Sequence, residues 1–254
     1  TIGQQYLPFG FFATNLVSDP LTLALGETSD SAITVSYQNV VRIAVYVFKG
    51  EVILAENMPT RDTNINNQKI SNFGINFGYI FSEKDITFDF GVGYINSIAE
   101  ANRLTDIINL GPTSLPPDEP GTDGAGIKKF IGGIASHLFI VWDSYSFIVE
   151  HIFATDPFAA QEIKLGKPAK PSALNIEMAL SISTSMTFAF GVQQTVDSIG
   201  LDLPETRALV GLSYALGESS QIAVELLRDF DYSAKDGGTS SEATAILVNI
   251  SAGF

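Results

Sequence analysis

Hydrophobic and polar residues alternate with a period of two along most of the chain, which is typical of β-strands whose two faces meet different surroundings. The alternation is clearest in the C-terminal SEATAILVNISAGF and in SNFGINFGYIF at residues 71–81. The pattern predicts about twelve strands, at residues 3–13, 31–39, 41–50, 70–82, 85–97, 127–142, 145–155, 173–183, 186–196, 206–216, 220–232 and 242–254. No run of about eighteen apolar residues predicts a transmembrane helix.

The segments between the predicted strands alternate in length. Tight turns fall at 38–41, 82–85, 143–144, 184–185 and 217–220, and longer polar connections at 14–30, 51–69, 98–126, 156–172, 197–205 and 233–241. This order predicts a meander of antiparallel strands with its short turns at one end and its long loops at the other. No stretch resembles an interdomain linker, so we expect one domain over residues 1–254.

The two faces of the predicted strands differ in composition. One face carries Ile, Val, Leu and Phe, whereas the other carries mainly Gly, Ala, Asn and Ser. A soluble β-sandwich, the alternative all-β fold, would present Lys, Glu, Thr and Arg to water. The sequence therefore favours an all-β transmembrane antiparallel up-and-down β-barrel of about 12 strands, with short periplasmic turns and long extracellular loops, in the bacterial outer membrane.

Composition narrows the classes of function. The chain of 254 residues has 28 Asp and Glu against 14 Lys and Arg, a net charge of −14. No basic cluster offers a footprint for phosphates, which argues against a nucleic-acid partner. The chain has no cysteine, so disulfides, thiolate catalysis and cysteine-based metal sites are excluded. We expect no cofactor.

Aromatic residues gather near the ends of the predicted strands, where amphipathic rings suit the lipid headgroup region. We expect these membrane-interface aromatics to be Tyr79, Phe81, Tyr94, Trp142, Tyr145, Tyr214 and Phe254. The last strand, Thr244–Phe254, also resembles the C-terminal signal that bacterial barrel-assembly machinery reads, so this machinery is an expected partner, together with outer-membrane lipid and lipopolysaccharide.

Parity along the strands predicts which residues point into the lumen. The predicted pore-lining residues are Arg42, Asn76, Asp89, His137, Glu150, Glu177, Glu225 and Arg207. Charges of both signs inside a barrel can set permeant selectivity. The alternative is that these residues form ion pairs that only brace the wall. The 98–126 connection is long enough to fold into the pore and constrict it.

Few residues of the sequence suggest an enzyme. Ser136 and His137 are adjacent in a predicted strand, so they point to opposite faces and cannot form a nucleophile–base pair. His137 and His151 are the only histidines, and neither belongs to a metal-binding motif. We expect no catalytic residues and no metal site, and an outer-membrane esterase or protease remains a minor alternative.

Several stretches resemble one family in order along the chain. They are GQQYLPFGFFATNLVSDPLTLALGET (3–28), FGVGYINSIAEANRL (90–104), KPSALNIEMAL (170–180), LPETRALVGLSYAL (203–216) and VELLRDFDYS (224–233). This set resembles the LbtU-type siderophore porin family. The resemblance implies an outer-membrane porin and uptake of ferric siderophores. Because family members are longer at the N-terminus, either N-terminal strands are missing here or the barrel is smaller.

These observations favour a porin for passive or facilitated diffusion of small solutes, since the strand pattern starts at once without a plug domain. The main alternative is a structural or secretion barrel within a larger envelope complex. An oligomer is compatible with either function, and neither the ligand nor the organism follows from the sequence.

Overall fold

The protein is described from a computed structural model that covers residues 1–52, 54, 70–110, 127–160, 162–163, 167–217 and 219–253. Twelve strands form one antiparallel sheet in which each strand pairs with the next along the chain. The strands are β1 (Ile2–Tyr6), β2 (Ser29–Gln38), β3 (Val41–Phe48), β4 (Asn72–Glu83), β5 (Ile86–Ile95), β6 (Gly133–Trp142), β7 (Tyr145–Ala154), β8 (Ser172–Ser183), β9 (Met186–Val196), β10 (Thr206–Ala215), β11 (Ser220–Phe230) and β12 (Glu242–Ala252).

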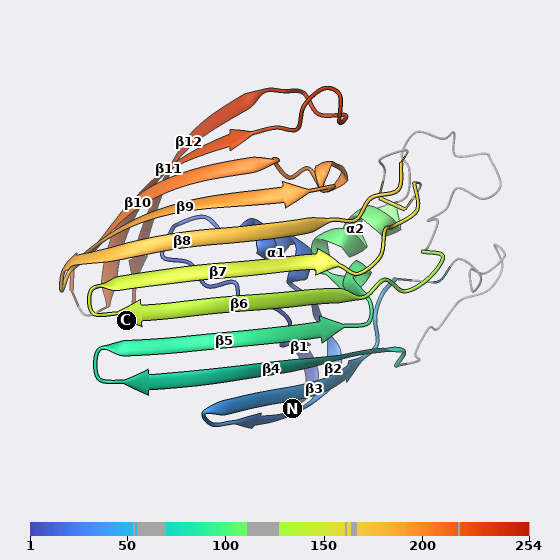
Figure 1. Cartoon of the computed structure of the whole chain (residues 1–254), viewed down its shortest axis with the longest axis horizontal. Helices are drawn as coiled ribbons and strands as arrows, with labels where there is room; N and C mark the ends of the chain where they lie inside the picture. The colour runs from blue at the N-terminus through green and yellow to red at the C-terminus, as the bar shows by residue number, and fades with distance from the viewer. Residues whose placement is uncertain are drawn as a thin grey trace.

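The two ends of the sheet differ as the sequence predicts. Short turns join the strands at the end on the left of Figure 1, and the long connections lie at the opposite end, hereafter the long-loop end. The helical elements are α1 (Leu21–Gly26), η2 (Ile98–Glu100), α2 (Asn102–Leu110) and η3 (Ile199–Leu201). Among the described residues, no helix is long and apolar enough to span a membrane.

The sheet curves but does not close, because β1 and β12 each have only one neighbour. β1 is short and pairs only with Ser29–Ile33 of β2. The outer edge of β12 has no partner along its length in the described chain, and nearly all of its residues are exposed. The fold is therefore an up-and-down antiparallel sheet of twelve strands with two free edges.

The prediction for the start of the chain is wrong in one respect. β1 ends at Tyr6, and residues 7–28, hereafter the inward segment, leave the sheet and cross its concave side before β2 begins. The segment is seen in dark blue behind β5–β9, where it includes α1 (Figure 1). The backbone turns at Gly10 and Phe12, both with positive φ, which an extended strand does not allow. Residues 3–13 are thus not one strand, and 14–30 is not an external loop.

A hydrophobic cluster fills part of the concave side at the long-loop end. Leu7, Phe9 and Leu25 of the inward segment pack with inner-face residues such as Tyr46 and Ile152. Apolar residues of the long connections complete the cluster: Ile98, Leu104, Ile108, Ile127, Ile131, Phe158, Ile163, Leu201 and Leu203. Helix α1 contacts β7, β8 and β9 and also α2. Burial of these side chains therefore attaches both the inward segment and the long connections to the wall.

Candidate functional site

The candidate site is the lumen on the concave side of the sheet. All eight predicted pore-lining residues share the face of the sheet that contacts the inward segment: Arg42, Asn76, Asp89, His137, Glu150, Glu177, Arg207 and Glu225. Their role in selectivity stays a prediction. The contacts of the seven ionisable residues, however, divide them into three glutamates that hold the inward segment and four residues that pair with other charged side chains of the wall.

Glu150 of β7 and Glu177 of β8 bind the first half of the inward segment. The Glu150 carboxylate accepts hydrogen bonds from the backbone N–H groups of Phe11 (2.5 Å) and Phe12 (3.2 Å) and from the Thr22 hydroxyl (2.6 Å). Glu177 accepts from the backbone and side-chain N–H groups of Asn15 (2.5 and 2.8 Å) and from the hydroxyl of Thr14 (2.7 Å). Both glutamates are 1% exposed.

Glu225 of β11 binds the second half. It accepts hydrogen bonds from the backbone N–H groups of Val17 (2.6 Å) and Ser18 (3.1 Å) and from the Ser18 hydroxyl (2.6 Å). On β9, the side-chain oxygen of Gln193 accepts from Leu21 N–H (3.1 Å). The segment is thus attached to four strands from β7 to β11 through its own backbone donors. These charge-assisted hydrogen bonds are among the strong ones in proteins.

Glycines on the inner face make room for bulky neighbours. Tyr46, Arg42 and His137 each face a glycine in the ladder, at Gly74, Gly78 and Gly91 respectively. A Cβ atom at any of these glycines would lie within 3 Å of the facing side chain. At these three places a large inward residue therefore occupies space above a position of the adjoining strand that has no side chain.

The same arrangement holds the inward segment. Gly191 and Gly211 face Glu177 and Glu225 in the ladder, and the space above them is occupied by Leu16. A Cβ atom at Gly211 would lie 2.8 Å from Leu16 Cδ2, and one at Gly191 would lie 3.2 Å from Cδ1. Leu16 is therefore seated on the wall between the two glutamates that bind its neighbours.

A charged cluster lies on the inner face of β3, β5 and β6. The Asp89 carboxylate pairs with the Arg42 guanidinium and lies 3.2 Å from His137 Nε2. The Phe11 ring stacks on the imidazole with a centroid separation of 4.2 Å. Asn76 is half-buried on the intervening strand β4, and a pocket of about 180 Å³ opens beside these residues.

Arg207 of β10 forms a second ion pair. Its Nε and Nη2 donate to the two carboxylate oxygens of Asp229 at 2.7 and 2.9 Å, a bidentate geometry. Both side chains are about one-fifth exposed. The inward arginines are thus compensated by carboxylates of the wall, the arrangement expected if ion pairs brace it.

The outer face carries the predicted interface aromatics. Tyr79, Phe81, Trp142, Tyr145 and Tyr214 lie toward the short-turn end, and Tyr94 lies at the long-loop end. All six are exposed, from 36% for Tyr94 to 64% for Trp142. Phe254 lies outside the described residues. Contact of these rings with a membrane interface stays a prediction.

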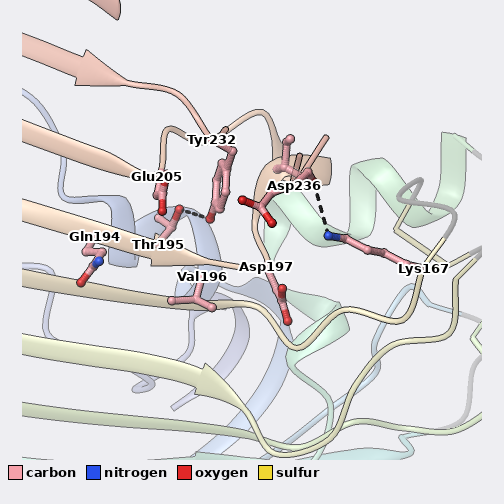
Figure 2. Close-up of a pocket in the computed structure, with 9 residues that line it drawn as sticks. Lys167, Gln194, Thr195, Val196, Asp197, Glu205, Tyr232 and Asp236 are labelled. Carbon is pink, nitrogen blue, oxygen red and sulfur yellow. Dashed lines mark hydrogen bonds between the residues drawn. The ribbon is translucent and has the colours of Figure 1, made fainter. Parts of the chain in front are cut away.

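A pocket of about 240 Å³ opens at the long-loop end, where the connections after β7, β9 and β11 meet (Figure 2). The Thr195 hydroxyl lies 2.6 Å from Tyr232 Oη, and Lys167 Nζ donates to the Asp236 backbone carbonyl at 3.3 Å. These contacts join neighbouring connections to each other. They therefore support the shape of the mouth.

The residues considered for catalysis lie as the alternation predicts. His137 is on the inner face, whereas Ser136 faces outward opposite His151. Within the described part of the chain, no three His, Asp or Glu side chains converge to hold a metal ion.

The inward segment and the fully buried Gln193 are not predicted from the sequence. The glutamates of the strands are nonetheless a sequence signal for such a segment. Glu177 and Glu225 each have a glycine on one side of the ladder and an apolar residue on the other, so no basic residue lies opposite either of them. Such carboxylates need donors from elsewhere in the chain.

Comparison with solved structures defines the class of fold: the sheet and its connections have the fold of outer-membrane porins. The chain superimposes along its whole length on an anion-selective porin from Comamonas acidovorans with a TM-score of 0.59 and 10% identity, covering 73% of that chain. The outer-membrane channel DcaP of Acinetobacter baumannii gives 0.58 and 11% identity, with 71% covered. An OmpF structure from Salmonella typhi gives 0.52.

Among curated sequences, the chain is 25% identical over 242 residues to a UPF0422 protein of Legionella pneumophila, covering 91% of this chain and 43% of the relative. It is 24% identical over 257 residues to a UPF0422 protein of Coxiella burnetii, covering 51% of it. The chain thus spans about half the length of the curated relatives it matches. No family model matches the sequence.

Proposed function

We propose that this chain forms the greater part of a solute-diffusion channel in the outer membrane of a Gram-negative bacterium. The observation that carries the proposal is the outer face of the sheet. Large apolar residues are exposed from strand to strand, for example Val35 (73%), Ile75 (47%) and Val192 (50%). An apolar belt of this extent suits lipid, and in water it would be an aggregation surface.

The proposal requires the two edges of the sheet to be covered. Backbone groups cannot remain unpaired in hydrocarbon, so a spanning sheet must close. The porin structures have more chain than this sheet matches, since only 71% and 73% of their lengths are covered. We therefore place further strands of the same polypeptide between β12 and β1, which makes the twelve strands about three quarters of a closed barrel.

In this channel the inward segment is a fixed constriction. It is attached to β7, β8 and β11 through three buried glutamates, and its apolar residues join the cluster at the long-loop end. A segment bound at so many points narrows the lumen permanently and sets the size of the solute that passes. Its position implies passive or facilitated diffusion of small hydrophilic solutes.

Ferric siderophores are the proposed specific cargo, on the strength of the family resemblance of the quoted stretches alone. Lipopolysaccharide and the barrel-assembly machinery are the proposed partners of the outer face and of the last strand.

Conductance in planar bilayers tests the function. The full-length protein that contains this chain, refolded in detergent, is expected to insert stable ion-conducting channels. Replacement of residues 9–26 by a Gly/Ser linker of equal length is expected to raise the single-channel conductance, because the constriction is removed. A ferric siderophore added to the bath is expected to block the wild-type current.

One observation favours a second candidate. The apolar cluster fills part of the lumen at the long-loop end, as it would in a structural or secretion barrel that does not conduct by itself. Correctly folded protein without any channel activity would favour that candidate. Channels that ignore the siderophore would leave a general porin.

A further inference from the structure

Most charged side chains on the inner face of the described strands have a hydrogen-bond or ion-pair partner, whereas one in the inward segment does not. Each of the three inner-face glutamates that hold the inward segment accepts three hydrogen bonds from it. Asp89 is paired with Arg42 and His137, and Arg207 is paired with Asp229. The arginine–aspartate pairs are neutral overall, and the three glutamates are at most 1% exposed, so a solute in the lumen does not contact their carboxylates.

Asp19 is the exception. It belongs to the inward segment and is exposed. Among the described residues, no hydrogen bond or ion pair reaches its carboxylate, whereas the residues on either side are fixed. Ser18 is bound to Glu225 of β11 and Leu21 to Gln193 of β9. The backbone at Asp19 therefore crosses the inner face between β11 and β9, and its side chain is exposed.

The open part of the lumen lies on the same side. The apolar cluster occupies the long-loop end along β2–β8 and its connections. By contrast, the inward-facing residues of β12 remain exposed, among them Ala243, Ala245 and Asn249. Inner-face residues toward the short-turn end are small or polar and uncharged, such as Ser181 and Thr187. Water and solute can therefore pass beside the second half of the inward segment.

We infer that the permeation path runs between the inward segment and the β9–β12 wall, and that Asp19 is the fixed charge that a permeating solute meets there. This inference rests on the proposed function and adds to it a class of solute. An exposed carboxylate without a counter-ion beside a permeation path attracts cations and repels anions. The channel therefore prefers cations or solutes that carry a cationic group.

The reversal potential of the full-length channel in a KCl gradient tests this inference. Wild type is expected to be cation-selective. Asp19→Asn is expected to lower the ratio of potassium to chloride permeability by about threefold or more, since one exposed charge is lost from the permeation path, and Asp19→Lys is expected to invert the preference. The matched control is Asp143→Asn, because Asp143 is an exposed carboxylate in the β6–β7 turn, outside the lumen.

A second measurement does not depend on selectivity. The chain has no cysteine, so Asp19→Cys introduces a unique thiol into this part of the protein. A positively charged methanethiosulfonate reagent is expected to modify it and reduce the current at once, whereas Ala179→Cys, 3% exposed on the inner face, is expected to stay unmodified.

The outcomes separate the inference from the function on which it rests. Conducting channels whose selectivity is unchanged in Asp19→Asn, or whose Asp19→Cys thiol is unreactive, would overturn the inference and leave the channel function standing. Absence of channels from folded wild-type protein would overturn both.

Discussion

The three inner-face glutamates show how single residues organise the lumen. Glu150, Glu177 and Glu225 are at most 1% exposed, and each takes three hydrogen bonds from the inward segment rather than from a cation. A buried carboxylate is costly unless such donors converge on it. Alternation predicts from sequence alone that these residues point inward, but not what binds them, because their donors are backbone groups and short polar side chains of a segment that the pattern does not place inside the sheet.

Glu225→Gln is expected to loosen the second half of the inward segment. The amide keeps the size of the side chain but turns an NH2 group toward donors, so at least one charge-assisted hydrogen bond, worth about 2 kcal/mol, is lost. Backbone hydrogen exchange at Val17 and Ser18 is expected to accelerate by about tenfold or more. Glu242→Gln makes the same change in an exposed ion pair and is the control. Equal exchange in both variants would contradict the assigned role.

Gly211→Val is expected to destabilise the folded protein through Leu16. The new side chain would occupy the space of Leu16 Cδ2, and overpacking of this kind costs about 1–3 kcal/mol. The temperature at which the folded band disappears on semi-native gels is expected to fall, and the added substitution Leu16→Ala is expected to restore part of it. Gly217→Ala, which meets no neighbouring atom within 4 Å, should change nothing. Lack of rescue by Leu16→Ala would show that the contact is unimportant.

At the scale of elements, alternation locates most strands well and fails at one. The ninth strand has the predicted bounds, Met186–Val196. The first does not, because Leu7, Phe9 and Phe11 alternate with other residues beyond the end of β1, although the backbone turns at Gly10. Leu7 and Phe9 are buried in the cluster beneath the long loops. A period of two therefore cannot distinguish a strand from an extended segment that binds the inside of the same sheet.

Two long connections meet at Glu100, and this contact is expected to depend on pH. Burial raises the pKa of the Glu100 carboxyl from 4.5 to about 7, against the hydrogen bonds from the N–H groups of Glu51 and Val52, which lower it. Because the pKa is higher in the folded state, the contact is most stable when Glu100 is protonated. It weakens as the pH rises from about 4.5 to about 7, by about 3 kcal/mol at most.

Hydrogen exchange of residues 50–52 and 98–101 between pH 5 and pH 8, corrected for intrinsic rates, is the appropriate measurement. Protection is expected to fall as the pH rises, and Glu100→Gln is expected to remove this dependence. Protection that rises with pH, or a dependence that persists in the variant, would show that another group is responsible.

For the molecule as a whole, the arrangement of the strands follows from the sequence, whereas closure does not. Alternating short and long connections predict an up-and-down order, and the order β1 to β12 confirms it. Whether β12 meets β1 depends on how many strands complete the curve, which the alternation within these twelve cannot specify. Closure therefore depends on what pairs with the exposed edge of β12 and with the short β1.

Cysteine pairs in the full-length protein test the proposed closure. Ala223→Cys with Asn249→Cys joins register partners of β11 and β12 and is expected to form a disulfide on oxidation. Gln5→Cys with Leu247→Cys spans the two edge strands and is expected to remain reduced, because further strands separate β1 from β12. An efficient disulfide in the second pair would instead establish a closed barrel of twelve strands.

The glycines that face Arg42, Tyr46 and His137 have a consequence for how such a wall can change over time. At each of these places the two facing residues share one space, so a substitution that adds a side chain at the glycine collides with its neighbour. Homologous walls should therefore exchange large and small residues in couples across adjoining strands. To reshape the lumen, a protein engineer would have to exchange the large residue and the facing glycine between adjoining strands instead of only truncating the large residue.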